Sequence, residues 1–179
     1  MTAAGVEAAV AAVATAAEDQ DRVRAPALVD ARAYSLLIVP VRLALGLAGL
    51  AGAILLHVSS GVSLGEFGFA AGFTFFLLLM SRRRRAFWKR VETAQPADEG
   101  VPVESALRTV VRATYPSTIG LTALTAIALA VNPVLAAFLA GILAGMALAS
   151  LQFGAEVIAW ERWHSIRLLI GGGRQLYVR

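Results

Sequence analysis

The chain reads VSLGEFGFAAGFTFFLLLMSRRRR from Val62 to Arg85. In a helix that rises about 1.5 Å per residue, the apolar run over 62–80 is long enough to cross a hydrocarbon core of about 30 Å. The run stops at four consecutive arginines, and clusters of Lys and Arg mark the cytoplasmic ends of membrane helices. This stretch therefore predicts a transmembrane helix that ends in the cytoplasm.

Three further apolar stretches predict three more spans. The third of the four spans is the shortest, and the residues around Tyr115 and Pro116 are expected to lengthen it. The fourth opens with Pro133, which suits the first turn of a helix because its missing N–H has no partner to lose there. We expect an all-α, polytopic membrane protein with four transmembrane helices arranged as two helical hairpins. The expected helices cover residues 36–58, 62–80, 115–131 and 133–156.

The composition supports a membrane location. Hydrophobic types make up 58% of the 179 residues and charged types 16%, whereas soluble domains are about 45–50% apolar and about 25% charged. Cysteine is absent, which excludes disulfides, thiolate metal sites and thiol nucleophiles. The net charge of +4 raises the question of nucleic acid, but the cations cluster beside apolar segments instead of covering a soluble face. No nucleic-acid partner is therefore expected.

The positions of the cations predict the topology. All 16 Lys and Arg residues lie within residues 22–42, 82–112 or 162–179, and none lies near the turns after the first and third spans. Four crossings put these three regions on one side, which the positive-inside rule assigns to the cytoplasm. A composition rich in Ala, Arg and Gly is typical of GC-rich bacterial genomes, and it favours the plasma membrane.

This topology divides the chain into three parts. We expect a cytoplasmic N-terminal tail that is partly helical or disordered, a four-helix membrane domain with one cytoplasmic loop, and an amphipathic cytoplasmic C-terminal tail. Helical periodicity in the last part continues to about Ile170, where three glycines interrupt it. The three parts are residues 1–33, residues 34–160 with the loop over 81–112, and residues 161–179.

Rows of small residues on three of the spans predict where helices pack. Small side chains let backbones approach closely, and this matters in lipid because no hydrophobic drive joins one apolar helix to another. We expect these rows to pack first within one chain, and packing between chains is the alternative. The rows contain Gly46 and Gly49 in the first span, Gly65, Gly68 and Gly72 in the second, and Gly141 and Gly145 in the fourth.

Two ionisable residues share these small-residue faces near the cytoplasmic ends of their helices. Arg42 lies in the first span and Glu156 at the end of the fourth. A charge at this depth either finds a partner or extends to the interface. An Arg42–Glu156 ion pair is one hypothesis, and an Arg42 side chain that only reaches for the interface is the other.

Other polar features carry weaker signals. His57 and Glu66 flank the first outer turn, where a proton relay is one interpretation and an interfacial hydrogen bond the favoured one. A threonine stripe on the third span either lines a polar path or, as favoured, bonds to its own backbone or across a packed interface. The stripe consists of Thr114, Thr118, Thr122 and Thr125.

The cations after the second span form a basic patch. Such a patch attracts anionic headgroups, and orientation of the helix accounts for it without a more specific role. Binding of a specific lipid or protein is the further possibility. The patch consists of Arg82, Arg83, Arg84, Arg85, Lys89 and Arg90.

Both the absence of catalytic motifs and the packing features of the spans bear on the expected function. The sequence contains no HExxH, GxSxG or phosphate-loop motif, so no enzyme activity, metal or cofactor is expected. We expect an accessory, scaffold or assembly subunit that binds membrane lipids and other membrane protein subunits or itself. An oligomeric transporter or channel is the alternative.

Overall fold

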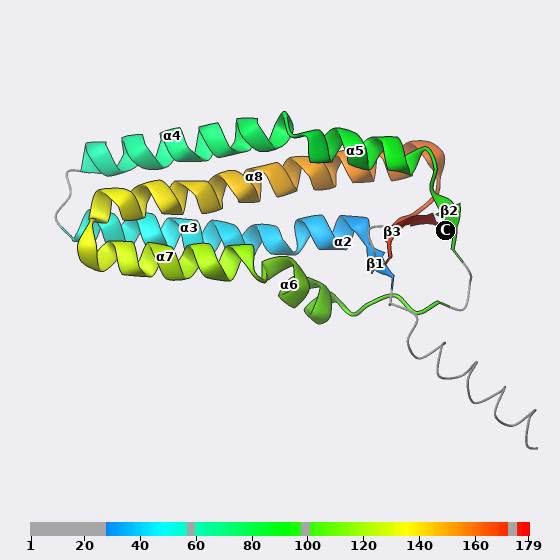
Figure 1. The fold of residues 1–179 in the computed structure, drawn as a ribbon, viewed down its shortest axis with the longest axis horizontal. Coiled ribbons are helices and arrows are strands. Elements are labelled where there is room, and N and C mark those ends of the chain that lie inside the picture. Colours follow the sequence, from blue (N-terminus) through cyan, green and yellow to red (C-terminus); the bar gives the residue numbers. More distant parts are fainter. Residues whose placement is uncertain (1–27, 57–59, 98–100, 172–174) are drawn as a thin grey trace, which may run out of the picture.

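A computed structural model describes residues 28–56, 60–97, 101–171 and 175–179. The chain forms an elongated bundle of helices with a small sheet at one end (Figure 1). The helices are α2 (Ala31–Leu36), α3 (Ile38–Leu55), α4 (Ser60–Leu79), α5 (Arg82–Val91), α6 (Ala106–Thr114), α7 (Ser117–Val131) and α8 (Pro133–His164). The strands are β1 (Val29–Asp30), β2 (Gln95–Pro96), β3 (Leu168–Ile170) and β4 (Leu176–Val178).

Several helices suit a membrane. Three stretches, Ala31–Leu55, Gly61–Val91 and Pro133–His164, are long and apolar enough to cross one. A fourth crossing is reached if α6 and α7, which meet at a bend of 53°, count as one span. The expectation of a mostly helical chain with several membrane-length helices is therefore confirmed.

Prolines account for two breaks between helices. Pro40 has no N–H for the carbonyl of Leu36, and its ring crowds that carbonyl, so α2 ends and α3 begins just before it. Pro116 disfavours a helical conformation at the preceding residue, and Tyr115 is accordingly extended with φ −89° and ψ 141°. The bend between α6 and α7 follows.

Helix α8 is the centre of the bundle. It packs on α3, α4 and α7, whereas α3 and α4 make few contacts with each other. Its start is fixed by Asn132, whose side-chain oxygen accepts the N–H groups of Val134 and Leu135 at 3.1 and 3.2 Å. The first two spans, expected to form a hairpin, thus associate mainly through α8.

Glycines set the spacing at both principal contacts of α8. A Cβ atom built on Gly46 of α3 would lie 2.9 Å from the carbonyl oxygen of Ala140. A Cβ atom on Gly145 would lie 2.5 Å from the carbonyl oxygen of Ala71 on α4, and one on Gly141 would clash with the carbonyl oxygen of Phe67. Since real Cβ atoms do not approach so closely, only glycine permits these backbones to touch.

The outcome for the three glycine rows is mixed. Gly46, Gly49, Gly141 and Gly145 all lie at helix contacts within the chain. Cβ atoms built on the α4 row would meet nothing within 4 Å in the described part of the chain, so the expectation that this row packs against the other described helices is wrong. Helix α4 instead turns a different face, with Phe67, Ala70, Ala71 and Thr74, toward α8. The open row consists of Gly61, Gly65, Gly68 and Gly72.

A four-stranded sheet closes one end of the bundle, so the all-α expectation is wrong in this part. Its strand order is β1-β3-β4-β2, with β2 parallel to β4 and the other pairs antiparallel. Buried Leu168 and Leu176 pack with Val157 of α8 beneath it. Strands of two or three residues have too few positions to show a periodic pattern in the sequence.

The sheet also corrects the expected C-terminal tail. Helix α8 ends at His164, and Ser165 takes a left-handed conformation with φ 57° before the chain enters β3. Helical structure therefore does not continue to Ile170. The strands come from the start of the described chain, the loop after α5 and the C-terminal end, so the structure brings all three cation-rich regions to one end.

Candidate functional site

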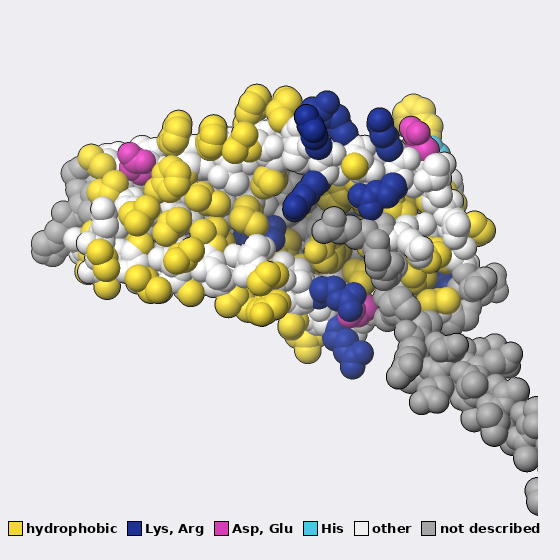
Figure 2. Space-filling model, viewed as in Figure 1, with side chains coloured by type: hydrophobic (Ala, Val, Ile, Leu, Met, Phe, Trp, Pro, Cys, Tyr) yellow, Lys and Arg dark blue, Asp and Glu magenta, His cyan; other side chains and the backbone are white. Residues whose placement is uncertain are grey.

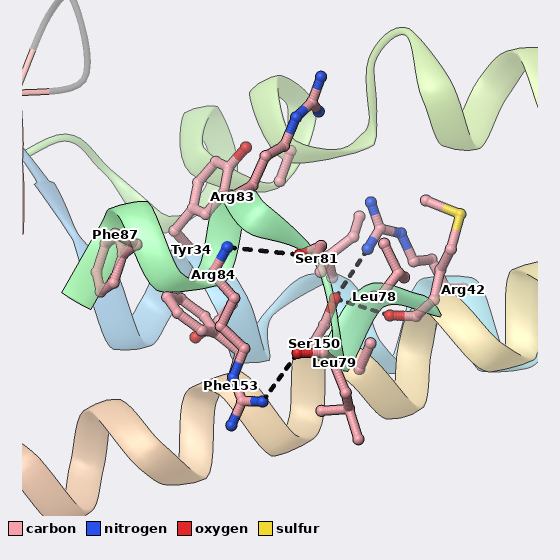
Figure 3. A pocket seen from close by; sticks show the side chains of 15 residues that line it. Tyr34, Arg42, Leu78, Leu79, Ser81, Arg83, Arg84, Phe87, Ser150 and Phe153 are labelled. Atoms are coloured by element: carbon pink, nitrogen blue, oxygen red, sulfur yellow. Dashed lines mark hydrogen bonds between the residues drawn. The ribbon is translucent and has the colours of Figure 1, made fainter. Parts of the chain in front are cut away.

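A cavity of about 380 Å³ opens where α4 ends and α5 begins. Its walls come from α2, α3, the α4–α5 junction, the end of α6 and the middle of α8 (Figure 3). Apolar side chains such as Leu78, Phe87 and Phe153 form much of the lining. The charged residues that line it are all arginines, Arg42, Arg83 and Arg84.

Arg42 is held in this cavity by two hydroxyl groups. Its Nε–H donates to Oγ1 of Thr118 at 3.0 Å, and an NH1 hydrogen donates to Oγ of Ser150 at 2.8 Å. The hydroxyl of Ser150 donates its own hydrogen bond to the carbonyl of Met146, which leaves the Ser150 oxygen free to accept. Both partners of Arg42 are therefore neutral, and no ion pair involving it occurs among the residues described.

The predicted Arg42–Glu156 pair is wrong, because Glu156 pairs with Arg84. Nε of Arg84 donates to Oε2 of Glu156 at 3.1 Å, and NH2 of the same arginine contacts Oε1. Gln152 donates to Oε1 as well, at 3.0 Å. This two-point contact ties α5 to α8 and neutralises Arg84, so it leaves Arg42 without the carboxylate that the sequence suggested.

Helix α5 holds the basic patch. Ser81 caps it by accepting the N–H of Arg84 at 3.4 Å. Figure 2 shows Lys and Arg side chains gathered over this part of the molecule, while hydrophobic side chains cover the opposite end of the same face. Arg84 turns inward, and Arg83 borders the cavity while remaining exposed. The other members, Arg82, Arg85, Lys89 and Arg90, are exposed on α5.

The threonine stripe divides into two parts. The hydroxyls of Thr114, Thr122 and Thr125 donate to the carbonyls four residues earlier in their own helices, at 2.7 to 2.8 Å. Thr118 instead accepts from Arg42 and is fully buried. Three of the four hydroxyls thus serve their own backbone, as favoured from the sequence.

The predicted contact between His57 and Glu66 stays a prediction. His57 lies outside the described residues, and Glu66 is half-buried on α4. Within the described part of the chain, no three His, Asp or Glu side chains come together in a way that would hold a metal ion.

The sequence did not single out Ser150 or the cavity. Ser150 is a lone hydroxyl in the apolar run of α8, at the same expected depth as Arg42. This match in depth is the feature of the sequence that indicates a contact between the two residues. No feature of the sequence distinguishes Arg84 from its three neighbours, because only the fold decides which arginine of α5 faces α8.

Comparisons with known protein families, with curated proteins and with solved structures find no match for this chain. Function therefore has to be argued from the chain's own geometry. That geometry offers a basic, partly apolar cavity at one end of the bundle and an open glycine row on α4.

Proposed function

We propose that this chain is a non-catalytic accessory or assembly subunit of a membrane protein complex, with four transmembrane crossings. Its basic end and both termini lie in the cytoplasm, and α4 contacts another membrane helix. The observation that carries the proposal is the open glycine row of α4, because a row of small residues that no part of the described chain contacts leaves a face on which a second helix can pack closely.

The cations and helix lengths support the four-crossing topology. Helix α7 has 15 residues and a length of about 22 Å, which is short of a hydrocarbon core of about 30 Å. Helix α6 completes this crossing in the proposal. An even number of crossings then agrees with strands from both halves of the chain meeting in one sheet, and the positive-inside rule favours the cytoplasm for that end.

The surroundings of the open row favour a helix as its partner. Phe69, Phe73 and Phe76 of α4 are each more than half exposed and border the glycines. A groove of glycines beside a ridge of aromatic rings offers shape complementarity to a facing helix, through dispersion contacts that lipid chains make less well. This favours an assembly role over simple insertion in lipid.

The interior of the bundle gives less support to the transporter alternative. The contacts of Gly46, Gly141 and Gly145 bring the helix backbones together in the half of the bundle away from the sheet, here called the apolar half. Thr122 and Thr125, the hydroxyls nearest this region on α7, donate to their own helix. A polar path through one chain would need polar groups facing a shared space at this depth.

Purification in a mild detergent tests the proposal. We expect the wild-type chain to elute with a second copy or another membrane protein. Light scattering measures the mass of the complex. Gly68→Leu and Gly72→Leu should abolish the association while the chain stays folded by circular dichroism. Gly120→Leu on α7 is the matched control, because a Cβ atom there also meets nothing within 4 Å.

The α4 variants and the control distinguish a specific partner face from a general effect of a larger side chain. Retention of the complex by Gly120→Leu and its loss in both α4 variants would support the partner face. A wild-type chain that elutes as a monomer with nothing attached, or α4 variants that keep the full complex, would refute it.

A further inference from the structure

We propose that the cavity beside Arg42 binds an anionic phospholipid. Its headgroup phosphate would contact the Arg42 guanidinium, and the first part of an acyl chain would lie against the apolar wall formed by α4 and α8. This assignment needs the chain in a membrane but does not depend on the partner face of α4.

The charge balance of the cavity calls for an anion. Among the residues that the structure describes, Arg42 has the hydroxyl oxygens of Thr118 and Ser150 as its hydrogen-bond partners, and Glu156 is occupied by Arg84 and Gln152. No Asp or Glu of the described ranges lines the cavity. Arg42 is half-buried inside a helix of membrane-spanning length, where a guanidinium is costly without a counter-charge. A phosphate is well suited, because arginine binds it with strong, charge-assisted hydrogen bonds.

The second arginine raises the attraction for an anion. Arg83 borders the cavity, and among the described residues it forms no ion pair. The neighbouring basic residues of α5 add a positive field at the same end of the bundle. Each such cation near a membrane surface favours anionic lipid over neutral lipid.

The apolar wall argues for an amphiphile over a free anion. Leu78 and Leu79 at the end of α4 line the cavity, as do Met146 and Phe153 of α8. These side chains would stay in contact with water around a small hydrated ion, whereas an acyl chain covers them. The volume of about 380 Å³ falls within the usual range of ligand sites, about 300–1,000 Å³.

The depth of the cavity matches the position of a headgroup. It lies where the apolar α4 gives way, at Ser81, to the arginines of α5. Polar headgroups meet hydrocarbon at this kind of boundary. The cations and the apolar wall therefore lie in the order in which a phospholipid presents its phosphate and its chain.

Native mass spectrometry of the full chain in dodecyl maltoside tests this assignment. Dioleoyl phosphatidylglycerol and dioleoyl phosphatidylcholine are added separately, and bound lipids are counted. We expect the wild-type chain to retain one tightly bound phosphatidylglycerol. Arg42→Gln should weaken that binding about tenfold, the loss of one charge-assisted contact. Arg82→Gln is the matched control, because Arg82 is an exposed cation of α5 that does not line the cavity.

A second variant keeps the test decisive if Arg42→Gln does not fold. Ala149 lines the cavity, and Ala149→Leu fills part of it while leaving every cation in place. We expect this variant also to lose the bound phosphatidylglycerol, with circular dichroism confirming its helical content.

Three results would overturn the assignment. Equal losses in Arg42→Gln and Arg82→Gln would mean that diffuse surface charge holds the lipid. Equal retention of phosphatidylcholine and phosphatidylglycerol would remove the need for a net anion. Displacement of phosphatidylglycerol by millimolar inorganic phosphate would make the ligand a free phosphate, whereas persistence of the lipid would support the amphiphile.

Discussion

The apolar half of the bundle and its basic end are held together in different ways. In the apolar half, glycines on α3 and α8 bring helix backbones into direct contact, and little space remains between them. At the basic end, hydrogen bonds from Arg42 and Arg84, a small sheet and a cluster of buried side chains join the same helices around a cavity.

In the proposed membrane orientation, the difference follows from the solvent around each half, which is lipid for the apolar half and water for the basic end. Lipid gives apolar helices no reason to associate except close contact, so small residues decide the packing there. Water at the basic end supports hydrophobic burial and polar contacts, and a conventional small core forms. Variants that act on one half and spare the other test this division.

The largest effect is expected from Gly145→Leu. A Cβ atom alone would lie 2.5 Å from the Ala71 carbonyl oxygen, so α4 and α8 would have to separate. We expect the free energy of unfolding, measured by titration with SDS in mixed micelles, to fall by about 3 kcal/mol or more. Gly120→Leu, which enters open space, should change it by less than about 0.5 kcal/mol. Equal effects of the two variants would contradict backbone contact as the basis of packing.

A smaller and more local loss is expected from Leu168→Ala in β3. Leu168 is fully buried beneath the sheet, and its truncation should cost about 2 kcal/mol. Hydrogen exchange should accelerate in β3 and β4 but not around Gly141, because the two halves are stabilised separately. Leu107→Ala is the control, since Leu107 is 75% exposed on α6. Faster exchange throughout α8 would show instead that the bundle opens as one unit.

The arginine contacts give a test of pairing at the basic end. In a double-mutant cycle, Arg84→Gln and Glu156→Gln should show a coupling energy of about 1.5 kcal/mol, as expected for a hydrogen-bonded charge pair. The cycle of Arg42→Gln with Glu156→Gln should be additive within about 0.5 kcal/mol. A strong coupling in the second cycle would restore the pair that the sequence suggested.

The sequence predicts the helices of the apolar half well because lipid imposes a simple requirement, long runs without charge. It also predicts that Gly46, Gly49, Gly141 and Gly145 lie at contacts. A helical wheel shows which residues share a face but not which face meets a neighbour, and the α4 row was misassigned for this reason.

The basic end was harder to predict. Its strands are too short to carry a pattern, and two of the three pairings among the described strands join residues more than 70 positions apart, such as Gln95 with Tyr177. The partner of Glu156 depends on which of the four consecutive arginines of α5 turns toward α8. The sequence predicts how far along a helix each residue lies, but it does not predict how each helix is rotated about its own axis.

Threonine-to-valine substitutions can be compared on the two sides of the boundary between the basic end and the apolar half. Thr118→Val removes the oxygen that accepts Nε–H of Arg42 in a fully buried position, so a donor is left unsatisfied at a cost of about 1 kcal/mol or more. Thr122→Val removes a hydroxyl that donates to the carbonyl of Thr118 in its own helix. That carbonyl also accepts the helix N–H, so the second change should cost less than about 0.5 kcal/mol. Both are measured by the same SDS titration. Equal costs would mean that the hydroxyl of Thr118 contributes no more than its volume, and Arg42 would then be held by Ser150 alone.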